Sequence, residues 1–106
     1  MEIKTYKYIP EAAKKIRKDV FVREQGFEYE FDDIDNVAVH LVMYEAGTPV
    51  ATCRIYWNEG KHTYIVGRIA VVLAYRGRHA GAELLQEAEK QLSLIHISEP
   101  TRLDVI

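Results

Sequence analysis

The loop at residues 76–81 has the residue types of a phosphate-binding site. Its sequence, RGRHAG, contains two glycines and two arginines directly before the apolar pattern of a helix. The first turn of a helix leaves backbone N–H groups unpaired and carries a partial positive charge. Glycines let the main chain approach a pyrophosphate, and arginine suits bidentate contact with phosphate oxygens. Taken alone, the loop fits equally well a basic turn with solvated arginines, in which Gly81 packs closely under a sheet.

Ionisable residues upstream of this loop are candidates for proton transfer or for binding a second substrate. Acidic residues gather between positions 28 and 35, where they would attract a cationic amine, although such a run is as often a solvated loop face. His40 has the chemistry to shuttle protons, but we favour a structural histidine that is hydrogen-bonded at the start of a strand. The candidate catalytic residues are Glu24, Asp35 and His40.

Two arginines are expected to have structural roles, and the histidines and the cysteine do not suggest a metal site. We expect Arg54 and Arg68, which lie on adjacent strands, to form structural ion pairs with acids from residues 28–35. The histidines and Cys53 show no H-x-x-x-H or C-x-x-C spacing, so we expect no metal site.

These residues need a scaffold of strands and helices. In chain order, the pattern predicts a strand at 2–9, a helix from 10 to about 26, an irregular or short helical connection at 27–36, strands at 38–47, 49–57 and 63–72, and a helix at 77–92. In the first helix Ala13, Ile16 and Val20 form the apolar face, and we expect the basic residues, Arg17 included, to face outward. The β-branched run at 63–72 is typical of a central strand buried on both faces. The order of elements predicts an α+β fold with a mixed sheet.

Length and composition limit the class of protein. A chain of 106 residues is expected to form one domain with a core of its own. The formal net charge of −2 argues against nucleic acid or an anionic membrane as a partner. Cys53 is the only cysteine and no apolar run is long enough to span a membrane, so we expect a soluble cytoplasmic protein.

The segment GRIAVVLAYRGRHAGAELL resembles the acetyl-CoA-binding segment of the GNAT superfamily of N-acetyltransferases. In that superfamily a central strand leads through a short turn to R/Q-x-x-G-x-G/A at the start of a helix. The upstream block KDVFVREQGFEYEFDDIDNVAVHLVMYEAGTPVATCRIY resembles one bacterial branch of the same superfamily. The resemblance covers residues 1–92, which we interpret as the N-terminal and central part of the domain.

The resemblance implies an α/β/α layered fold in which a mixed, mostly antiparallel sheet is flanked by helices and the C-terminal part is missing. It implies transfer of an acetyl group from acetyl-CoA to a primary amine of a small molecule or peptide, with no metal. A backbone N–H of the central strand would stabilise the thioester oxygen. The residues implied to bind acetyl-CoA are Ile69, Ala70, Val71, Val72, Arg76, Gly77, Arg78, His79, Ala80, Gly81 and Ala82.

Three positions depart from the family pattern. His79 replaces a glycine of the loop, and we expect helical backbone angles there, which would require no positive φ. Gly67, before Arg68, stands where many relatives carry the acid that helps to deprotonate the amine, so the general base is not identified. The tyrosine that protonates the leaving thiolate in the family lies beyond the next strand and has no counterpart here.

Residues 93–106 form an atypical tail. Its first residues, SLIHI, have the pattern of an added strand. The longer stretch SLIHISEPTRL resembles the translated read-through of a sequencing adapter, and we favour this foreign origin, which would make the domain a truncated one. An unfinished sheet edge would favour a homodimer.

Two other functions stay open at this stage. The chain is alternatively a CoA- or nucleotide-binding module without catalytic activity, or a structural α+β interaction domain with no ligand at the loop. The acceptor amine is not defined by these residues.

Overall fold

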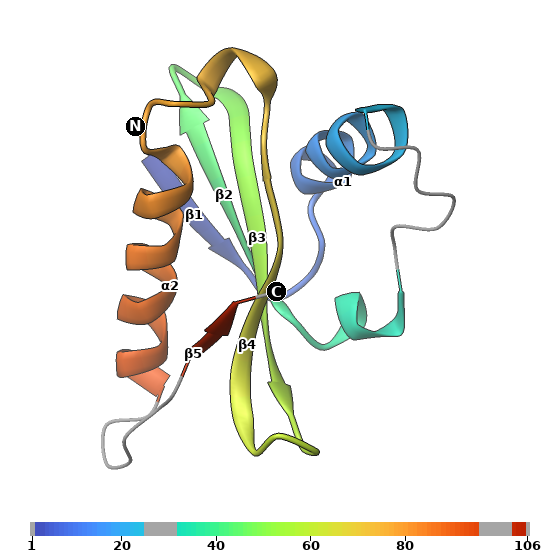
Figure 1. The fold of residues 1–106 in the computed structure, drawn as a ribbon, viewed down its shortest axis with the longest axis vertical. Coiled ribbons are helices and arrows are strands. Elements are labelled where there is room, and N and C mark those ends of the chain that lie inside the picture. The colour runs from blue at the N-terminus through green and yellow to red at the C-terminus, as the bar shows by residue number, and fades with distance from the viewer. Residues whose placement is uncertain (1, 25–31, 96–102, 106) are drawn as a thin grey trace.

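The structure, a computed structural model, describes residues 2–24, 32–95 and 103–105 (Figure 1). Its strands are β1 (Glu2–Tyr6), β2 (Val39–Glu45), β3 (Thr48–Asn58), β4 (Thr63–Val71) and β5 (Leu103–Val105). Its helices are α1 (Glu11–Arg17), the π-helix η1 (Lys18–Glu24), the 3₁₀ helices η2 (Asp33–Asn36) and η3 (Leu73–Tyr75), and α2 (Ala80–Ile95).

The strands form a single sheet in the order β1-β2-β3-β4-β5. The first four pair antiparallel with their neighbours, and β5 pairs parallel to β4. The tight turn between β2 and β3 places Ala46 at φ 50° and Gly47 at φ 84°, and two positive φ values in succession match the right-handed twist of a hairpin. The sheet is therefore mixed and mostly antiparallel, as the resemblance implied.

The middle strand of the sheet is β3 rather than β4. Residues 50–55 of β3 are buried without interruption, whereas Arg68, Ile69 and Val71 in the second half of β4 are only half-buried. The parallel strand β5 pairs with β4 only at Tyr64, Ile65 and Val66. The strand predicted at residues 63–72 thus lies inside the sheet, between β3 and β5, as expected for a central strand, but its burial is less complete than that of β3.

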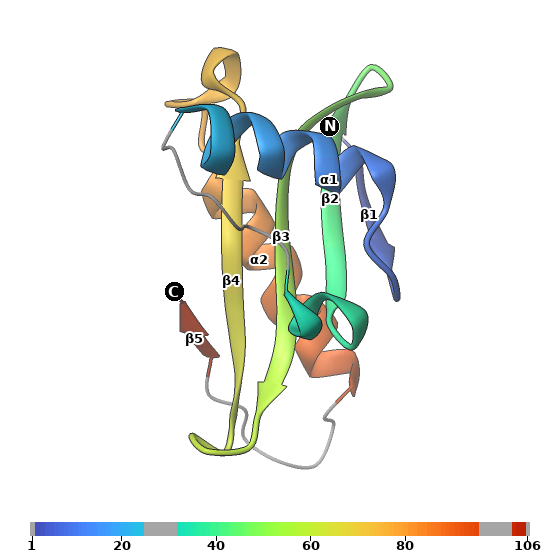
Figure 2. The same cartoon turned by 90° about the vertical axis from the view of Figure 1, so that its right-hand side faces the viewer.

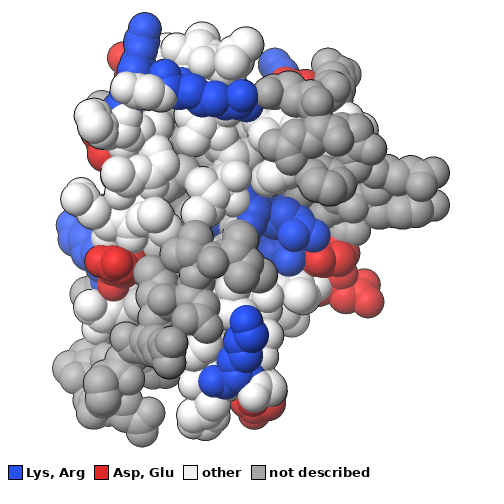
Figure 3. All heavy atoms as spheres, in the orientation of Figure 1, with Lys and Arg blue, Asp and Glu red and all other residues white. Residues whose placement is uncertain are grey.

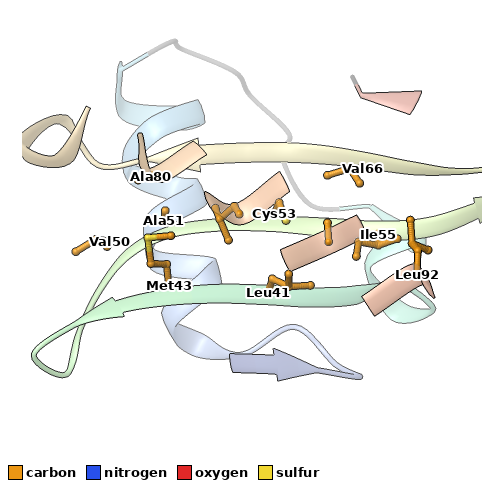
Figure 4. Packing of buried hydrophobic residues seen from close by; sticks show 11 residues of the cluster. Leu41, Met43, Val50, Ala51, Cys53, Ile55, Val66, Ala80 and Leu92 are labelled. Atoms are coloured by element: carbon orange, nitrogen blue, oxygen red, sulfur yellow. The ribbon is translucent and has the colours of Figure 1, made fainter. Parts of the chain in front are cut away.

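One helix covers each face of the sheet, which confirms the predicted α/β/α layers (Figures 1 and 2). On the α1 face, Ala13, Ile16 and Val20 pack against Val42 and Ala70. On the other face, the helical stripe of α2 packs against β2, β3 and β4 (Figure 4). Successive residues of a strand point to opposite faces, so β2 supplies both cores. The second cluster consists of Leu41, Met43, Val50, Ala51, Cys53, Ile55, Val66, Ala80, Leu84, Ala88 and Leu92.

Helix boundaries differ from the predictions within the first helix and at both ends of α2, whereas the short helical connection is confirmed. The first helix changes from α to π at Lys18, and its predicted end near Gly26 lies outside the described residues. The helix predicted from residue 77 begins at Ala80 and continues to Ile95, so Ser93–Ile95 are helical and not the start of a strand. The predicted short helical connection is confirmed by η2, and the rest of that connection, residues 27–31, lies outside the description.

Candidate functional site

A β-bulge interrupts the pairing of β3 with β4. Thr52 pairs with Ala70 and Arg54 pairs with Gly67, so two residues of β4 lie opposite one residue of β3. Arg68, the first of these two, has φ 50°. A bulge bends the strand that carries the extra residue and increases its local twist. The strand therefore changes direction at the point where the resemblance places the start of the acetyl-CoA site.

Beyond the bulge, main-chain groups of β4 point to the outer edge of the sheet. The Val72 N–H donates to the Val50 carbonyl oxygen at 2.9 Å, so Val72 faces β3. Because N–H and C=O groups alternate sides along an antiparallel strand, those of Val71 face outward. Arg76 Nε donates to the Val71 carbonyl oxygen at 2.9 Å on this outer side. Within the described ranges, the outer edge of β4 has no strand partner after Val66.

The loop between β4 and α2 contains two residues in the left-handed region. Gly77 has φ 80° and His79 has φ 62°. The expectation of helical angles at His79 is therefore wrong: the loop must reverse direction between η3 and α2, and it does so with left-handed residues at both positions. A left-handed conformation costs a residue other than glycine about 1–2 kcal/mol, although histidine tolerates it better than most side chains.

The loop and the first turn of α2 line a shallow pocket of about 330 Å³ that is open to solvent. The first helical hydrogen bond runs from the Glu83 N–H to the His79 carbonyl oxygen at 3.0 Å. The N–H groups before Glu83 have no carbonyl of their own helix to bond, as at every helix start. A methyl group built on Gly77 or Gly81 would meet no atom within 4 Å, so Gly81 does not pack under the sheet. The residues that line the pocket are Val71, Tyr75, Arg76, Gly77, His79, Ala80 and Gly81.

The structure separates the residues proposed for acetyl-CoA into three groups. Six of them line the pocket: Val71, Arg76, Gly77, His79, Ala80 and Gly81. Arg78 lies over the ring of the pocket residue Tyr75, with the guanidinium carbon 5.1 Å from the ring centroid. The remaining four are not among the lining residues: Ile69, Ala70 and Val72 pack against the hydrophobic clusters, and Ala82 is exposed in the first turn of α2.

An ion-pair network lies on the α1 face of the same sheet. Arg17 of α1 donates from Nη1 and Nη2 to the two carboxylate oxygens of Asp35, at 2.7 and 3.1 Å. Arg54 of β3 donates to Asp35 at 3.1 Å and to both oxygens of Asp32, at 2.6 and 3.2 Å. Arg68 Nη2 donates to Asp32 Oδ2 at 3.3 Å. The expected ion pairs of Arg54 and Arg68 with this acidic segment are confirmed.

The network holds its carboxylates in the ionised form. Burial alone would raise the pKa of Asp35, but hydrogen bonds from Arg17, the Asp32 main chain and Arg54 hold that pKa at about 2. Hydrogen bonds from Arg54 lower the pKa of Asp32 as well. Acidic and basic side chains lie next to one another on this part of the surface (Figure 3). Two carboxylates held ionised by arginines are poor acceptors of a substrate proton.

His40 lies beneath this network and is buried. Its Nε2 is 3.0 Å from the Asp35 carbonyl oxygen, and since a carbonyl only accepts, Nε2 carries the proton and donates. Burial lowers the pKa of His40, which keeps the ring neutral. This arrangement fits the structural histidine that the sequence favoured. A catalytic role for Asp35 or His40 stays a prediction, and the side chain of the third candidate, Glu24, lies outside the described residues.

Arg17 is the residue that the sequence pattern placed wrongly. Its exposed fraction is 1 %, whereas an outward-facing side chain was expected. The helical spacing contains the signal, since residues 13, 16, 17 and 20 fall on one helix face. A charged residue on an apolar stripe requires a buried partner, and that partner is Asp35.

Three further observations concern metal ligands, the cysteine and membrane-spanning helices in the described part of the chain. Residues 2–24, 32–95 and 103–105 contain no group of three or more side chains that would hold a metal ion. Burial raises the pKa of the Cys53 thiol to about 12, so this cysteine is not a nucleophile. Over the same residues, no helix is both long and apolar enough to cross a membrane.

Comparison with known proteins gives a consistent result. The sequence profile described as "Acetyltransferase (GNAT) family" matches residues 7–99. An uncharacterised N-acetyltransferase of Bacillus subtilis, YjcF, is 31 % identical over 77 residues, which cover 71 % of this chain and 54 % of that protein. The chain thus spans about half the length of the curated relatives it matches.

Solved structures agree with the profile. The crystal structure of a putative N-acetyltransferase from Lactobacillus plantarum has a TM-score of 0.78 and 30 % sequence identity, and the match covers 90 % of this chain and 68 % of that one. A GNAT family acetyltransferase from Brucella melitensis, solved in complex with acetyl-CoA, has a TM-score of 0.62 and 18 % identity, and the match covers 90 % of this chain and 71 % of that one.

Proposed function

The chain belongs to the acetyltransferase (GNAT) family, and from this premise we propose that it binds acetyl-CoA and transfers the acetyl group to a primary amine of a small molecule or peptide. The observation that carries the proposal is the pocket at the start of α2, which continues into the outward-facing edge of β4. The acetyl-CoA complex of the Brucella melitensis relative supports the choice of ligand.

The residues around the pocket suit the phosphate part of this ligand. The unpaired N–H groups of Ala80 and Gly81 at the start of α2 would bind the pyrophosphate, because a helix start combines free donors with partial positive charge. Arg76 and Arg78 add positive charge on the same loop. The absence of a Cβ at Gly81 leaves that side of the pocket open to the phosphates.

The edge of β4 suits the amide-containing arm of the same ligand. Val71 directs its N–H and C=O outward, so an extended chain that carries amides would pair with it as an added strand does. Arg76 Nε holds the Val71 carbonyl at present, and it would release this oxygen when the ligand binds. Acetyl-CoA itself supplies the thioester whose oxygen gains negative charge during transfer, and outward N–H groups of this strand would stabilise that charge.

Proton removal from the amine has no obvious agent among the described side chains. Gly67 replaces the acid on β4, while Asp32 and Asp35 are held by arginines and His40 is buried and neutral. We therefore propose that water receives this proton. The same observation favours the alternative, a module that binds CoA without transferring the acetyl group.

Calorimetry with acetyl-CoA and with desulfo-CoA tests the binding step. We expect saturable binding of both by the full chain and loss of binding in Gly81→Glu, which adds bulk and negative charge against the phosphates. Space around Gly81 is open, so this variant should keep its fold. Gln86→Glu adds the same charge further along α2, at an exposed position outside the pocket, and should bind as the unmodified chain does. Normal affinity in Gly81→Glu would refute the proposed site.

Release of free thiol from acetyl-CoA in the presence of an amine panel tests the transfer step. Amine-dependent release supports the enzyme, and saturable binding without release supports the binding module. We also propose a cytoplasmic location, on the basis of the single buried cysteine, and a homodimer formed through the sheet edge. Residues 1–92 would form the family part of the domain, with 93–106 as an atypical addition.

A further inference from the structure

We propose that Arg78 binds the 3′-phosphate on the ribose of CoA and thereby makes the chain prefer CoA to 3′-dephospho-CoA. The inference rests on the proposed CoA site at the start of α2. It assigns to one side chain of the loop a phosphate group other than the pyrophosphate.

The two arginines of the loop are directed to different parts of the site. Arg76 Nε donates to the Val71 carbonyl oxygen at 2.9 Å, on the outer side of β4. Arg78 instead lies over the ring of Tyr75, with its guanidinium carbon 5.1 Å from the ring centroid. Gly77 stands between the two arginines, and its φ of 80° turns the chain there. The two side chains would therefore contact different positions of a ligand bound at the loop.

Tyr75 fixes the position of Arg78 relative to the pocket. The tyrosine is half-buried, packs against the core cluster on the α2 face and lines the pocket. Its N–H donates to the Val72 carbonyl oxygen at 2.9 Å, at the start of η3. Arg78 is exposed and is not among the lining residues. Its guanidinium is thus held at the rim of the pocket, beside the groups that would bind the pyrophosphate.

The contact with the ring leaves the guanidinium able to bind an anion. A cation over an aromatic ring is attracted by the electron-rich face of that ring, but the contact supplies no oxygen acceptor for the N–H donors. Among the residues that the structure describes, Arg78 forms no ion pair with a carboxylate. The planar fork of a guanidinium matches two oxygens of a phosphate group. Arg78 is therefore a positioned cation with donors left for a phosphate.

The chemistry of CoA matches this arrangement. CoA has a pyrophosphate and, on the adjoining ribose, a phosphate monoester at the 3′ position. The unpaired N–H groups at the start of α2 suit the pyrophosphate, so the monoester is the group left for a cation beside the pocket. A phosphate monoester carries a charge of about −1.5 to −2 at pH 7, which favours a guanidinium partner. Arg78 would thus add affinity for CoA that 3′-dephospho-CoA cannot gain.

Calorimetry with CoA and with 3′-dephospho-CoA, each titrated into the full chain, tests this role. We expect CoA to bind at least about tenfold more tightly, the difference typical of charge-assisted hydrogen bonds to one phosphate. Arg78→Gln should lose this preference, and Arg78→Lys, which keeps the charge without the planar fork, should keep part of it. Tyr75→Phe keeps the ring under the guanidinium and should retain the full preference, whereas Tyr75→Leu should reduce it.

Two further variants serve as controls. Arg76→Gln should weaken the binding of both ligands by a similar factor, because this arginine is directed to the β4 edge, and should therefore keep the preference. Lys90→Gln removes an exposed cation farther along α2 and should change neither affinity.

Equal affinity for the two ligands in the unmodified chain would overturn the proposal. So would a preference that survives in Arg78→Gln or one that is lost in Arg76→Gln. The comparison in the unmodified chain needs no variant, so a misfolded variant does not affect it. Saturable binding of both ligands with equal affinity contradicts only the role of Arg78, whereas the absence of CoA binding contradicts the proposed function and this role together.

Discussion

Replacing Asp35 with asparagine should destabilise the fold more than any change on the exposed surface. Asp35 is 4 % exposed and accepts hydrogen bonds from Arg17, Arg54 and the Asp32 main chain. Asparagine has the same shape but no charge, and its NH₂ group would face guanidinium donors. The change therefore leaves two buried arginines, 1 % and 2 % exposed, without their shared counter-charge.

The magnitude follows from the burial of the pair. Removing one partner of a buried ion pair costs about 3–5 kcal/mol, because the remaining charge is left without compensation. Domains of this size have a total free energy of unfolding of roughly 5–15 kcal/mol. At about 4–8 °C per kcal/mol near this chain length, even the lower bound would reduce Tm by roughly 12 °C.

Thermal and urea denaturation followed by circular dichroism measure this effect. Asp33→Asn provides the matched control, since Asp33 lies in the same 3₁₀ helix η2 but is exposed, and its replacement should change the free energy of unfolding by less than about 0.5 kcal/mol. A Tm for Asp35→Asn equal to that of Asp33→Asn would refute the view that this network holds the α1 face together.

Two further predictions concern pH and the loop. The pKa of Asp35 is about 2 in the folded chain against an ordinary value of 3.8, so the stability that Asp35 contributes above about pH 4 is lost as the pH falls toward 2. Between these pH values the urea midpoint should fall steeply in the unmodified chain and more gently in Asp35→Asn. Parallel curves for the two proteins would contradict the assignment. His79→Gly should raise the free energy of unfolding, measured with urea, by about 0.5–1 kcal/mol, because relief of the left-handed conformation outweighs the entropy that glycine adds to the unfolded state. Ala82→Gly, within α2, should lower the free energy of unfolding. Destabilisation by both variants would count against strain at His79.

The features that the sequence predicted well depend on local pattern. The stripe of Leu84, Ala88 and Leu92 needs only helical spacing, and the turn at Ala46 and Gly47 needs only a short polar break between apolar runs. The α/β/α layers follow from such elements and from the family resemblance. The pocket-lining loop was found in the same way, from glycines and arginines placed before a helix.

The features that were missed depend on pairing between distant segments. The bulge at Arg68 is a property of the register between β3 and β4, and no residue type in β4 specifies it. The left-handed angle of His79 follows from the direction in which α2 must leave the sheet. Arg17 was placed outside because its charge outweighed its position on the apolar stripe, and only the pairing with Asp35 makes that position stable.

The contact between Arg17 and Asp35 closes a chain loop, since the two residues are 18 positions apart. The entropy of closing such a loop rises only with the logarithm of its length, and doubling the length costs about 0.6 kcal/mol. Once its two ends are held by a buried ion pair, the segment can change in length between Val20 and Asp32 at little cost to the fold, provided that the core residue Val20 and the network residue Asp32 are kept. Insertions and deletions between Val20 and Asp32 can therefore arise without rebuilding the sheet beneath α1.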